Sequence, residues 1–326
     1  MENKTQSLAG ERISVGQFIL KYGIYFLFAL IVIILALFNE NFLQGTNIIN
    51  VGLQTSVNAV LAIGMTYVII TGGIDVSIGA VMAVASACGV GLIKVYDVPV
   101  GLGILVIIAV GTLFGLINGL SVAYLRMPPF LVTLATQGIA RGFTLVISSG
   151  KSWYDLPQAF QYLGKQSYFS IPVLVFMVAI LYVLGWILLR KTVYGRKVYA
   201  IGGNAEAAKV SGISVRRVQM SVYVVMGLVA GISALMTTAR VGSFWAAMGE
   251  GIEFMVIAGV VVGGTSLAGG VGSLGGTLVG VLLLGVINNA LNLWGIPSEW
   301  QDVFRGAIIF LAVMLDALRT RYRKAD

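Results

Sequence analysis

The chain reads SVNAVLAIGMTYVIITGGIDVSIGA over residues 56–80, where a long apolar run meets a polar segment rich in glycine. The apolar run covers residues 51–70 and is long enough to cross the roughly 30 Å hydrocarbon core of a bilayer as a helix. Gly72, Gly73 and Gly79 then surround Asp75, and glycine at this density interrupts a helix. We therefore expect a membrane helix that breaks near Asp75 and exposes backbone groups to a polar solute.

The whole composition agrees with a membrane protein. Of the 326 residues, 58% are hydrophobic and 10% are charged, and the mean hydropathy is +0.95. The apolar runs are continuous rather than alternating, which predicts an all-α polytopic bundle and argues against a barrel. About ten membrane helices are predicted, some of them broken or re-entrant, over residues 22–38, 51–70, 77–93, 100–125, 130–148, 171–189, 218–239, 254–264, 274–293 and 303–318.

The basic residues predict how the chain is oriented. Arg12 and Lys21 precede the first span, and a basic cluster follows the last one. The segment 190–217 carries seven basic residues and one acidic residue. Because basic loops stay in the cytoplasm, we expect both termini and this loop to be cytoplasmic. The resulting division is a tail over 1–21, one membrane domain over 22–318 that includes the loop 190–217, and a tail over 319–326.

Several kinds of site are excluded or disfavoured by composition. The chain has no histidine and one cysteine, Cys88, so we predict no metal site, no disulfide and no catalytic residue. The formal charge of +8 resides at the ends of apolar runs and in one loop, which indicates membrane orientation and contact with lipid rather than nucleic-acid binding. Gly270, Gly272 and Gly275 spell GxGxxG, but they lack the βαβ surroundings of a dinucleotide site.

Polar residues within or between the spans are candidates for a solute path, because polar side chains are costly in a bilayer. We select Asn58, Asp75, Ser77, Asn118, Arg141, Thr265, Ser266 and Asn288. Thr265 and Ser266 belong to a second broken region, GGTSLAGGVGSLGG, residues 263–276. The alternatives are structural: Asp75 could cap the helix that follows it, carbonyl groups could satisfy Arg141, and the amides could bond between helices.

Glycines at four-residue spacing predict close helix packing. Gly111, Gly115 and Gly119 lie on one face of one helix, and Gly227 and Gly231 lie on one face of another. Small residues at this spacing let two backbones approach each other. We expect them to pack helices within the chain rather than to form a dimer.

The loop KTVYGRKVYAIGGNAEAAKVSGISVRR, residues 191–217, predicts a short surface helix. Asn204 can cap a helix over residues 205–210, and Gly212 can end it. With Ala207 and Ala208 on its surface, such a helix would fit a groove in another protein. The alternative is a basic loop held against anionic lipid headgroups.

Within that loop, Glu206, Ala207, Ala208 and Gly212 resemble the EAA...G motif through which permease subunits of bacterial ABC importers engage their ATPases. The later Ile and Leu-Pro of the longer motif are absent. Three segments, residues 56–80, 195–213 and 260–296, are similar to the ribose-type sugar permease family. Through this resemblance, the residues implied to contact the ATPase are Gly195, Gly203, Asn204, Glu206, Ala207, Ala208 and Gly212.

The resemblance implies a multi-pass permease in the bacterial inner membrane that imports a pentose or a hexose by alternating access. It implies a second permease copy, most simply a homodimer, two cytoplasmic ABC ATPases that hold ATP and Mg, and a periplasmic sugar-binding protein. This chain itself would bind no cofactor and would not be an enzyme. The alternatives are a branched-chain amino acid permease of the same class, and an ion-coupled transporter using Asp75, Glu253 or Asp316.

Overall fold

The computed structural model describes residues 15–169 and 171–323. Each of the ten predicted spans corresponds to a helix, and most helix ends lie within a few residues of the prediction. These helices are α1 (Val15–Phe38), α2 (Gly45–Ile70), α3 (Ile78–Val95), α4 (Val100–Ala123), α5 (Pro129–Ser148), α7 (Val173–Arg190), α10 (Val215–Val241), α11 (Ile252–Val262), α12 (Leu274–Leu293) and α13 (Ser298–Arg323). Residues 15–21 of the predicted N-terminal tail belong to α1, and residues 319–323 of the predicted C-terminal tail belong to α13. The rest of both tails, 1–14 and 324–326, lies outside the described residues.

Three further helices and a small hairpin connect the long helices. The short helix predicted in the loop is present as α9 (Ala205–Val210). The helices α6 (Gln158–Lys165) and α8 (Val193–Gly203) and the hairpin β1 (Ser167–Tyr168)–β2 (Ile171–Pro172) were not predicted. Neither α6 nor α8 is a long apolar run, so a search for membrane spans passes over both.

Within the described residues, seven helices are long and apolar enough to cross a membrane: α2, α3, α4, α5, α7, α10 and α12. The α11 helix and the described apolar part of α1 are shorter, and α13 carries Glu299, Asp302 and Arg305 near its start. The all-α, multi-pass architecture is therefore confirmed. The count of ten crossings stays a prediction.

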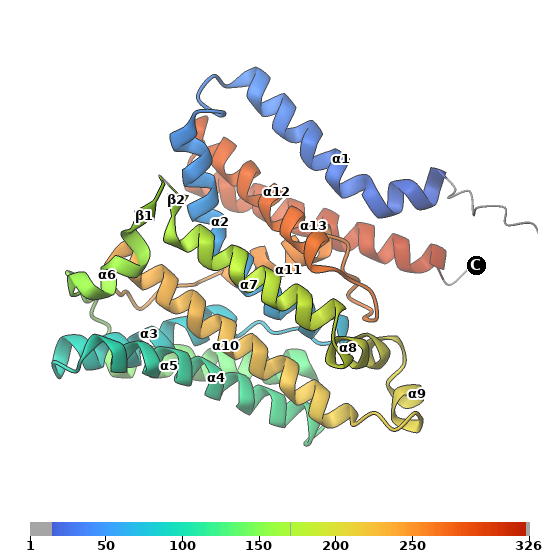
Figure 1. Ribbon diagram of the computed structural model, residues 1–326, viewed down its shortest axis with the longest axis horizontal. Helices are drawn as coiled ribbons and strands as arrows, with labels where there is room; N and C mark the ends of the chain where they lie inside the picture. Colours follow the sequence, from blue (N-terminus) through green and yellow to red (C-terminus); the bar gives the residue numbers. More distant parts are fainter. Residues whose placement is uncertain (1–14, 170, 324–326) are drawn as a thin grey trace, which may run out of the picture.

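The most deeply buried of the long helices are α2, α3 and α10. Most of each of these helices is buried, whereas α4, α5 and α7 expose long rows of large apolar side chains. Such rows face hydrocarbon in a membrane protein. The first residues of α1, the last residues of α13, and both α8 and α9 lie at one end of the molecule, and α6 and the hairpin lie at the other (Figure 1).

The glycine rows pack α4 against α10, which confirms the prediction that they join helices within one chain. A Cβ atom added at Gly111 would lie 2.8 Å from the Cα of Gly231, and one added at Gly115 would lie 2.8 Å from the Cα of Gly227. These separations leave no room for a side chain. Close backbone approach of this kind replaces the hydrophobic effect as the main source of helix association in lipid.

Polar side chains also join the helices. Asn47 on α2 and Asn289 on α12 exchange two amide hydrogen bonds, of 3.0 and 2.9 Å. The hydroxyl groups of Thr66 and Thr277 join the same two helices at 2.9 Å. Arg240 on α10 donates to the carbonyl oxygen of Leu53 on α2 at 2.8 Å. The amide of Asn289 is thus used for bonding between helices.

Candidate functional site

The break after α2 forms a buried polar cluster around Asp75, which is 2% exposed. The Oδ1 atom of Asp75 accepts hydrogen bonds from the backbone N–H of Ser77 at 2.9 Å and from its Oγ at 2.6 Å. Asn118 on α4 donates to the Oγ of Ser77 at 3.0 Å and to the Oδ2 of Asp75 at 3.4 Å. The structure therefore brings three of the predicted residues together.

A fourth member of this cluster, Thr136 on α5, was not predicted. Its hydroxyl donates to the Oδ1 of Asn118 at 2.6 Å. Thr133, one turn earlier, accepts from the backbone N–H of Val76 at 3.2 Å and so holds the break against α5. Threonine is common in apolar helices, where its hydroxyl bonds to the preceding turn, so neither residue stands out in the sequence.

Asp75 is not the N-cap of the next helix. That cap is Ser77, which makes no side-chain capping bond, and Asp75 stands two residues before it. The carboxylate instead closes a turn ahead of α3 and anchors Asn118. The space beside Asp75, Ser77, Asn118 and Gly115 has no volume for a water molecule. The cluster is therefore closed in this conformation and holds three helices together.

Replacing Asp75 by leucine should lower the stability of the purified protein by about 1–3 kcal/mol, because the donors on Ser77 and Asn118 would lose their acceptor in a buried place. Thermal unfolding in detergent measures this as a fall in Tm. Asp75→Asn keeps one oxygen acceptor and should lose less. An unchanged Tm for Asp75→Leu would contradict the structural role of the carboxylate.

Arg141 lies on α5 beside the connection between α10 and α11. Its Nη1 donates to the carbonyl oxygens of Ala246 at 3.0 Å and Met248 at 2.8 Å. The predicted alternative, an arginine satisfied by carbonyl groups, is thus confirmed. The same side chain also lines a cavity of about 570 Å³, together with Leu134, Gln137, Gly138, Leu145, Ala246, Ala247 and Glu250.

Two further polar residues lie near this cavity. Glu253 was named from the sequence only as a carboxylate for an ion-coupled transporter, and Gln137 was missed. The Nε2 of Gln137 donates to the Oε1 of Glu253 on α11 at 3.0 Å. Glu253 is 3% exposed, and its Oε2 has no hydrogen-bond partner among the described residues. Gln137 and Arg141 are four residues apart on α5, and this spacing places two costly polar groups on one helix face. This spacing is the sequence pattern from which Gln137 could have been identified.

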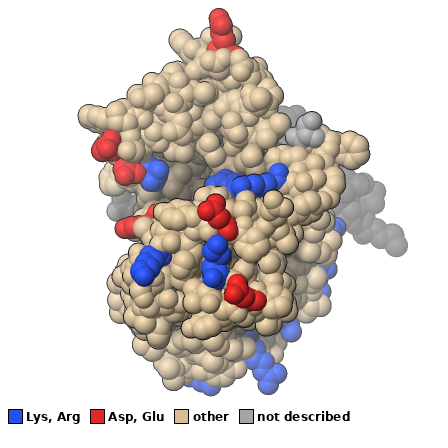
Figure 2. All heavy atoms as spheres, turned by 90° about the vertical axis from the view of Figure 1, so that its left-hand side faces the viewer, with Lys and Arg blue, Asp and Glu red and all other residues tan. Residues whose placement is uncertain are grey.

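The end of the molecule that carries α6 and the hairpin is shown in Figure 2. Acidic and basic side chains both lie on this face, and no large area is of one sign. The surface is hollowed between its upper and lower parts. Such a mixed surface does not attract a strongly charged partner of either sign.

The second broken region packs against the first one. The backbone N–H of Gly270 donates to the carbonyl oxygen of Ile70, the last residue of α2, at 2.9 Å. Gly269 and Gly270 have φ values of 85° and 73°, which other residues rarely adopt. Thr265 is fully buried in this turn, and the backbone N–H of Ser266 donates to the carbonyl oxygen of Val271 at 3.0 Å. Both residues shape the turn.

Helix α8 contacts both breaks. The hydroxyl of Tyr199 donates to the carbonyl oxygen of Gly272 in the second break at 2.8 Å. Burial raises the pKa of this phenol, although the positive charge of Arg190 acts to lower it. Tyr199 is therefore a neutral hydrogen-bond donor. Gly202 lies directly against the carbonyl oxygen of Ile70, where a Cβ atom would collide with it. One helix of the basic loop therefore touches the end of α2 and the glycine turn together.

The predicted short helix has the predicted ends. The Oδ1 of Asn204 accepts from the backbone N–H of Ala207 at 2.9 Å, which caps α9. Gly212 follows the helix with a φ of 80°. Glu206 and Ala207 are exposed.

One expectation for this helix was wrong. Ala208 is 4% exposed and faces the body of the protein, not the surface, because it lies on the side of α9 that returns toward the bundle. Val210, by contrast, is 89% exposed at the end of the helix.

Two of the glycines implied to contact the ATPase lie on α8 and differ in their surroundings. Gly195 is buried, and a Cβ atom there would meet the carbonyl oxygen of Leu189. A Cβ atom at Gly203 would meet nothing within 4 Å.

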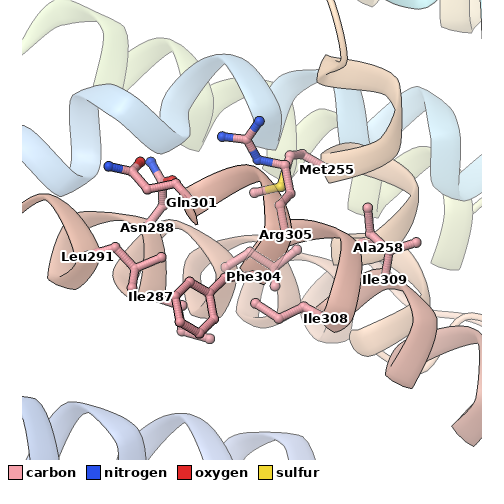
Figure 3. A pocket seen from close by; sticks show the side chains of 11 residues that line it. Met255, Ala258, Ile287, Asn288, Leu291, Gln301, Phe304, Arg305, Ile308 and Ile309 are labelled. Atoms are coloured by element: carbon pink, nitrogen blue, oxygen red, sulfur yellow. The ribbon is translucent and has the colours of Figure 1, made fainter. Parts of the chain in front are cut away.

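The remaining candidates lie apart from these clusters. Asn58 is half-buried on α2 and belongs to none of them. Asn288 lines a narrow crevice between α11, α12 and α13, near Gln301 and Arg305 (Figure 3). The rest of its lining is apolar, and its volume of about 10 Å³ is at the lower limit for one water molecule. Over the residues that the structure describes, no three His, Cys, Asp or Glu side chains are grouped as metal ligands.

Comparison with known proteins assigns the chain to a family. Residues 47–313 match the family described as branched-chain amino acid transport system / permease component. The chain belongs to this permease family. The matched region of the permease includes both broken segments and the whole of α8 and α9.

Several curated relatives of the permease carry the names of sugar permeases. A ribose import permease protein of Bacillus subtilis (strain 168) is 42% identical over 317 residues, which are 96% of this chain and 98% of the relative. A D-allose transport system permease protein of Escherichia coli (strain K12) is 36% identical over 299 residues, 91% of this chain and 92% of the relative.

A galactose/methyl galactoside import permease protein of the same strain is 34% identical over 323 residues, 93% of this chain and 95% of the relative. The resemblance to sugar permeases that the three sequence segments indicate is therefore confirmed. No solved structure matches the permease.

Proposed function

We propose that this chain is the membrane-spanning subunit of an ATP-driven importer that moves a monosaccharide into the bacterial cytoplasm. Its relatives carry the names of ribose, allose and galactose permeases, at 34–42% identity over more than nine-tenths of this chain. These names favour a sugar over the branched-chain amino acid of the family description. The membrane in question is the inner membrane, with α8 and α9 on its cytoplasmic side.

The contact of α8 with both broken segments carries this proposal. A separate ATPase binds α9, whose exposed Glu206, Ala207 and Val210 project from the bundle. When the ATPase pair closes on ATP, α9 and α8 move with it. Because α8 touches Ile70 and Gly272 directly, this movement reaches both breaks and reopens the bundle toward the other face.

The partners follow from this assignment of ATP hydrolysis to a separate ATPase and of the sugar path to this chain. ATP and Mg bind to the ATPase, and this chain contributes no catalytic residue. A periplasmic sugar-binding protein delivers the sugar at the end that carries α6, and a second copy of the chain completes the path. The recognition of the sugar is shared with the binding protein, which agrees with the small number of polar side chains in the membrane.

An ion-coupled transporter is the main rival. Reconstitution into liposomes separates the two: we expect D-ribose, D-allose or D-galactose to accumulate only when the ATPase, ATP and the binding protein are all present. Accumulation by this chain alone, driven by a sodium or proton gradient, would replace the proposal with the rival.

Replacing Gly212 by valine should weaken binding of the ATPase about tenfold, because a β-branched residue at a φ of 80° displaces the end of α9. Co-purification of the ATPase with the tagged permease measures the loss. Asparagine tolerates a positive φ, so Gly212→Asn should retain most of the binding. Equal recovery of the ATPase with Gly212→Val and the unmodified chain would argue against docking at α9.

A further inference from the structure

The cavity beside Arg141 has the size and the lining of a small-molecule site. Its volume of about 570 Å³ lies within the range of about 300–1,000 Å³ that is usual for ligand pockets. One wall is α5, and the other is the connection between α10 and α11. It lies apart from the closed cluster at Asp75 and, unlike that cluster, it is open in this conformation.

Two polar groups of the cavity are held in place, those of Arg141 and Gln137. The Nη1 of Arg141 is fixed by two carbonyl oxygens, whereas its other N–H groups have no hydrogen-bond partner among residues 15–169 and 171–323. The Nε2 of Gln137 is fixed by the buried Glu253, which leaves the amide oxygen of Gln137 without a partner in that part of the chain. Fixed groups with unused hydrogen-bonding capacity bind a ligand without first having to be ordered.

The charges of the cavity select the ligand class. Glu250 lines the wall opposite Arg141, and the buried Glu253 lies directly behind Gln137. An anion would be repelled by these carboxylates, and a cation by the guanidinium. A neutral solute rich in hydroxyl groups can accept from Arg141 and donate to Glu250 and to the oxygen of Gln137. Leu134 and Leu145 offer apolar contacts for the C–H groups of such a solute.

We infer that this cavity is a monosaccharide-binding step of the translocation path, in the outer half of the membrane, with Gln137, Arg141 and Glu250 as the hydrogen-bonding residues. The inference rests on the proposed function and adds a location and a set of contacts. The sugar enters here from the binding protein and passes to the inner half when α8 displaces the breaks.

Cysteine labelling tests the inference in the complete transporter. Cys88 is the only cysteine, so a Cys88→Ala chain is the background. Gly138→Cys places a thiol in the cavity, at a position where a Cβ meets nothing within 4 Å. Ile139→Cys, the next residue of α5, is the control because Ile139 is exposed but does not line the cavity. Ala247→Cys tests the opposite wall, should the first variant fail to insert.

A neutral, hydrophilic methanethiosulfonate reagent, added from the outside, should label Gly138→Cys at least tenfold faster than Ile139→Cys. D-Ribose, D-allose or D-galactose, supplied with the binding protein, should slow the labelling of Gly138→Cys about fivefold. A thiol at Gly138 or Ala247 that the reagent does not reach, or a labelling rate that no sugar changes, would overturn the inference. Sugar uptake by the Cys88→Ala background is measured in parallel, and its absence would count against the proposed function instead.

Discussion

Replacing Gly202 by valine should abolish sugar uptake while ATP hydrolysis by the bound ATPase continues. A side chain at Gly202 collides with the carbonyl oxygen of Ile70 and with the backbone of Gly270, so α8 can no longer lie between the two breaks. Forcing extra atoms into a packed place costs about 1–3 kcal/mol or more, which here is relieved by moving α8 away. We expect uptake to fall at least tenfold in reconstituted vesicles.

An exposed residue of the same helix provides a matched control. Ala200 also belongs to α8, but it is exposed. Ala200→Val should therefore retain uptake within about twofold and retain the ATPase. Two results would show that the contact of α8 with Ile70 does not transmit motion: normal uptake by Gly202→Val, or the same loss in both variants.

Replacing Gly115 by leucine should prevent the bundle from folding. The added side chain would meet the backbone of Gly227 and the carbonyl oxygen of Tyr223, and so force α4 away from α10. Neither helix can compensate, because the contact is between two backbones and not between flexible side chains. We expect the variant to be almost absent from the membrane fraction, or to aggregate when it is extracted in detergent.

Gly101→Leu on the same helix isolates the effect of position. Nothing lies within 4 Å of a Cβ at Gly101, so this variant should be recovered at close to the normal level. Size-exclusion chromatography of the extracted proteins compares the two variants directly. A monodisperse Gly115→Leu protein with the normal Tm would contradict the packing of α4 on α10.

Features with local causes could be predicted from the sequence. The apolar runs gave the long helices, and Asn204 with Gly212 gave both ends of α9, because capping and a positive φ depend on a few neighbouring residues. The glycine spacing on α4 and α10 likewise predicted that each of them packs closely against a helix of the same chain, but not which helix that is. In each case, the residues that decide the feature lie within one or two turns of it.

Features that depend on contacts distant in sequence could not be predicted. The approach of Gly202 to Ile70 joins residues more than one hundred positions apart, and a pair of glycines carries no sign of its partner. Ala208 looked like a surface residue because its neighbours are polar, yet it faces the bundle. Asp75 was correctly selected as unusual, but only the positions of Asn118 and Thr136 show that it holds helices together.

Part of the lining of the cavity beside Arg141 could be predicted from the sequence. Arg141 was selected by its charge, and Gln137 one turn earlier could have been selected by its spacing. Glu250 and Ala247 could not, since they lie in the connection between α10 and α11, and only the hydrogen bonds from Arg141 to that connection fix its position.

Crosslinking from Val210 tests the central claim most directly. In a Cys88→Ala background, Val210→Cys carries a thiol at the exposed end of α9, and Tyr154→Cys carries one in the connection that leads to α6 at the opposite end. A photoactivatable thiol reagent should join the ATPase to the permease from position 210 and not from position 154. If position 210 gives no such product, or reacts with an impermeant reagent outside intact cells, no ATPase acts on α9 and the account is wrong.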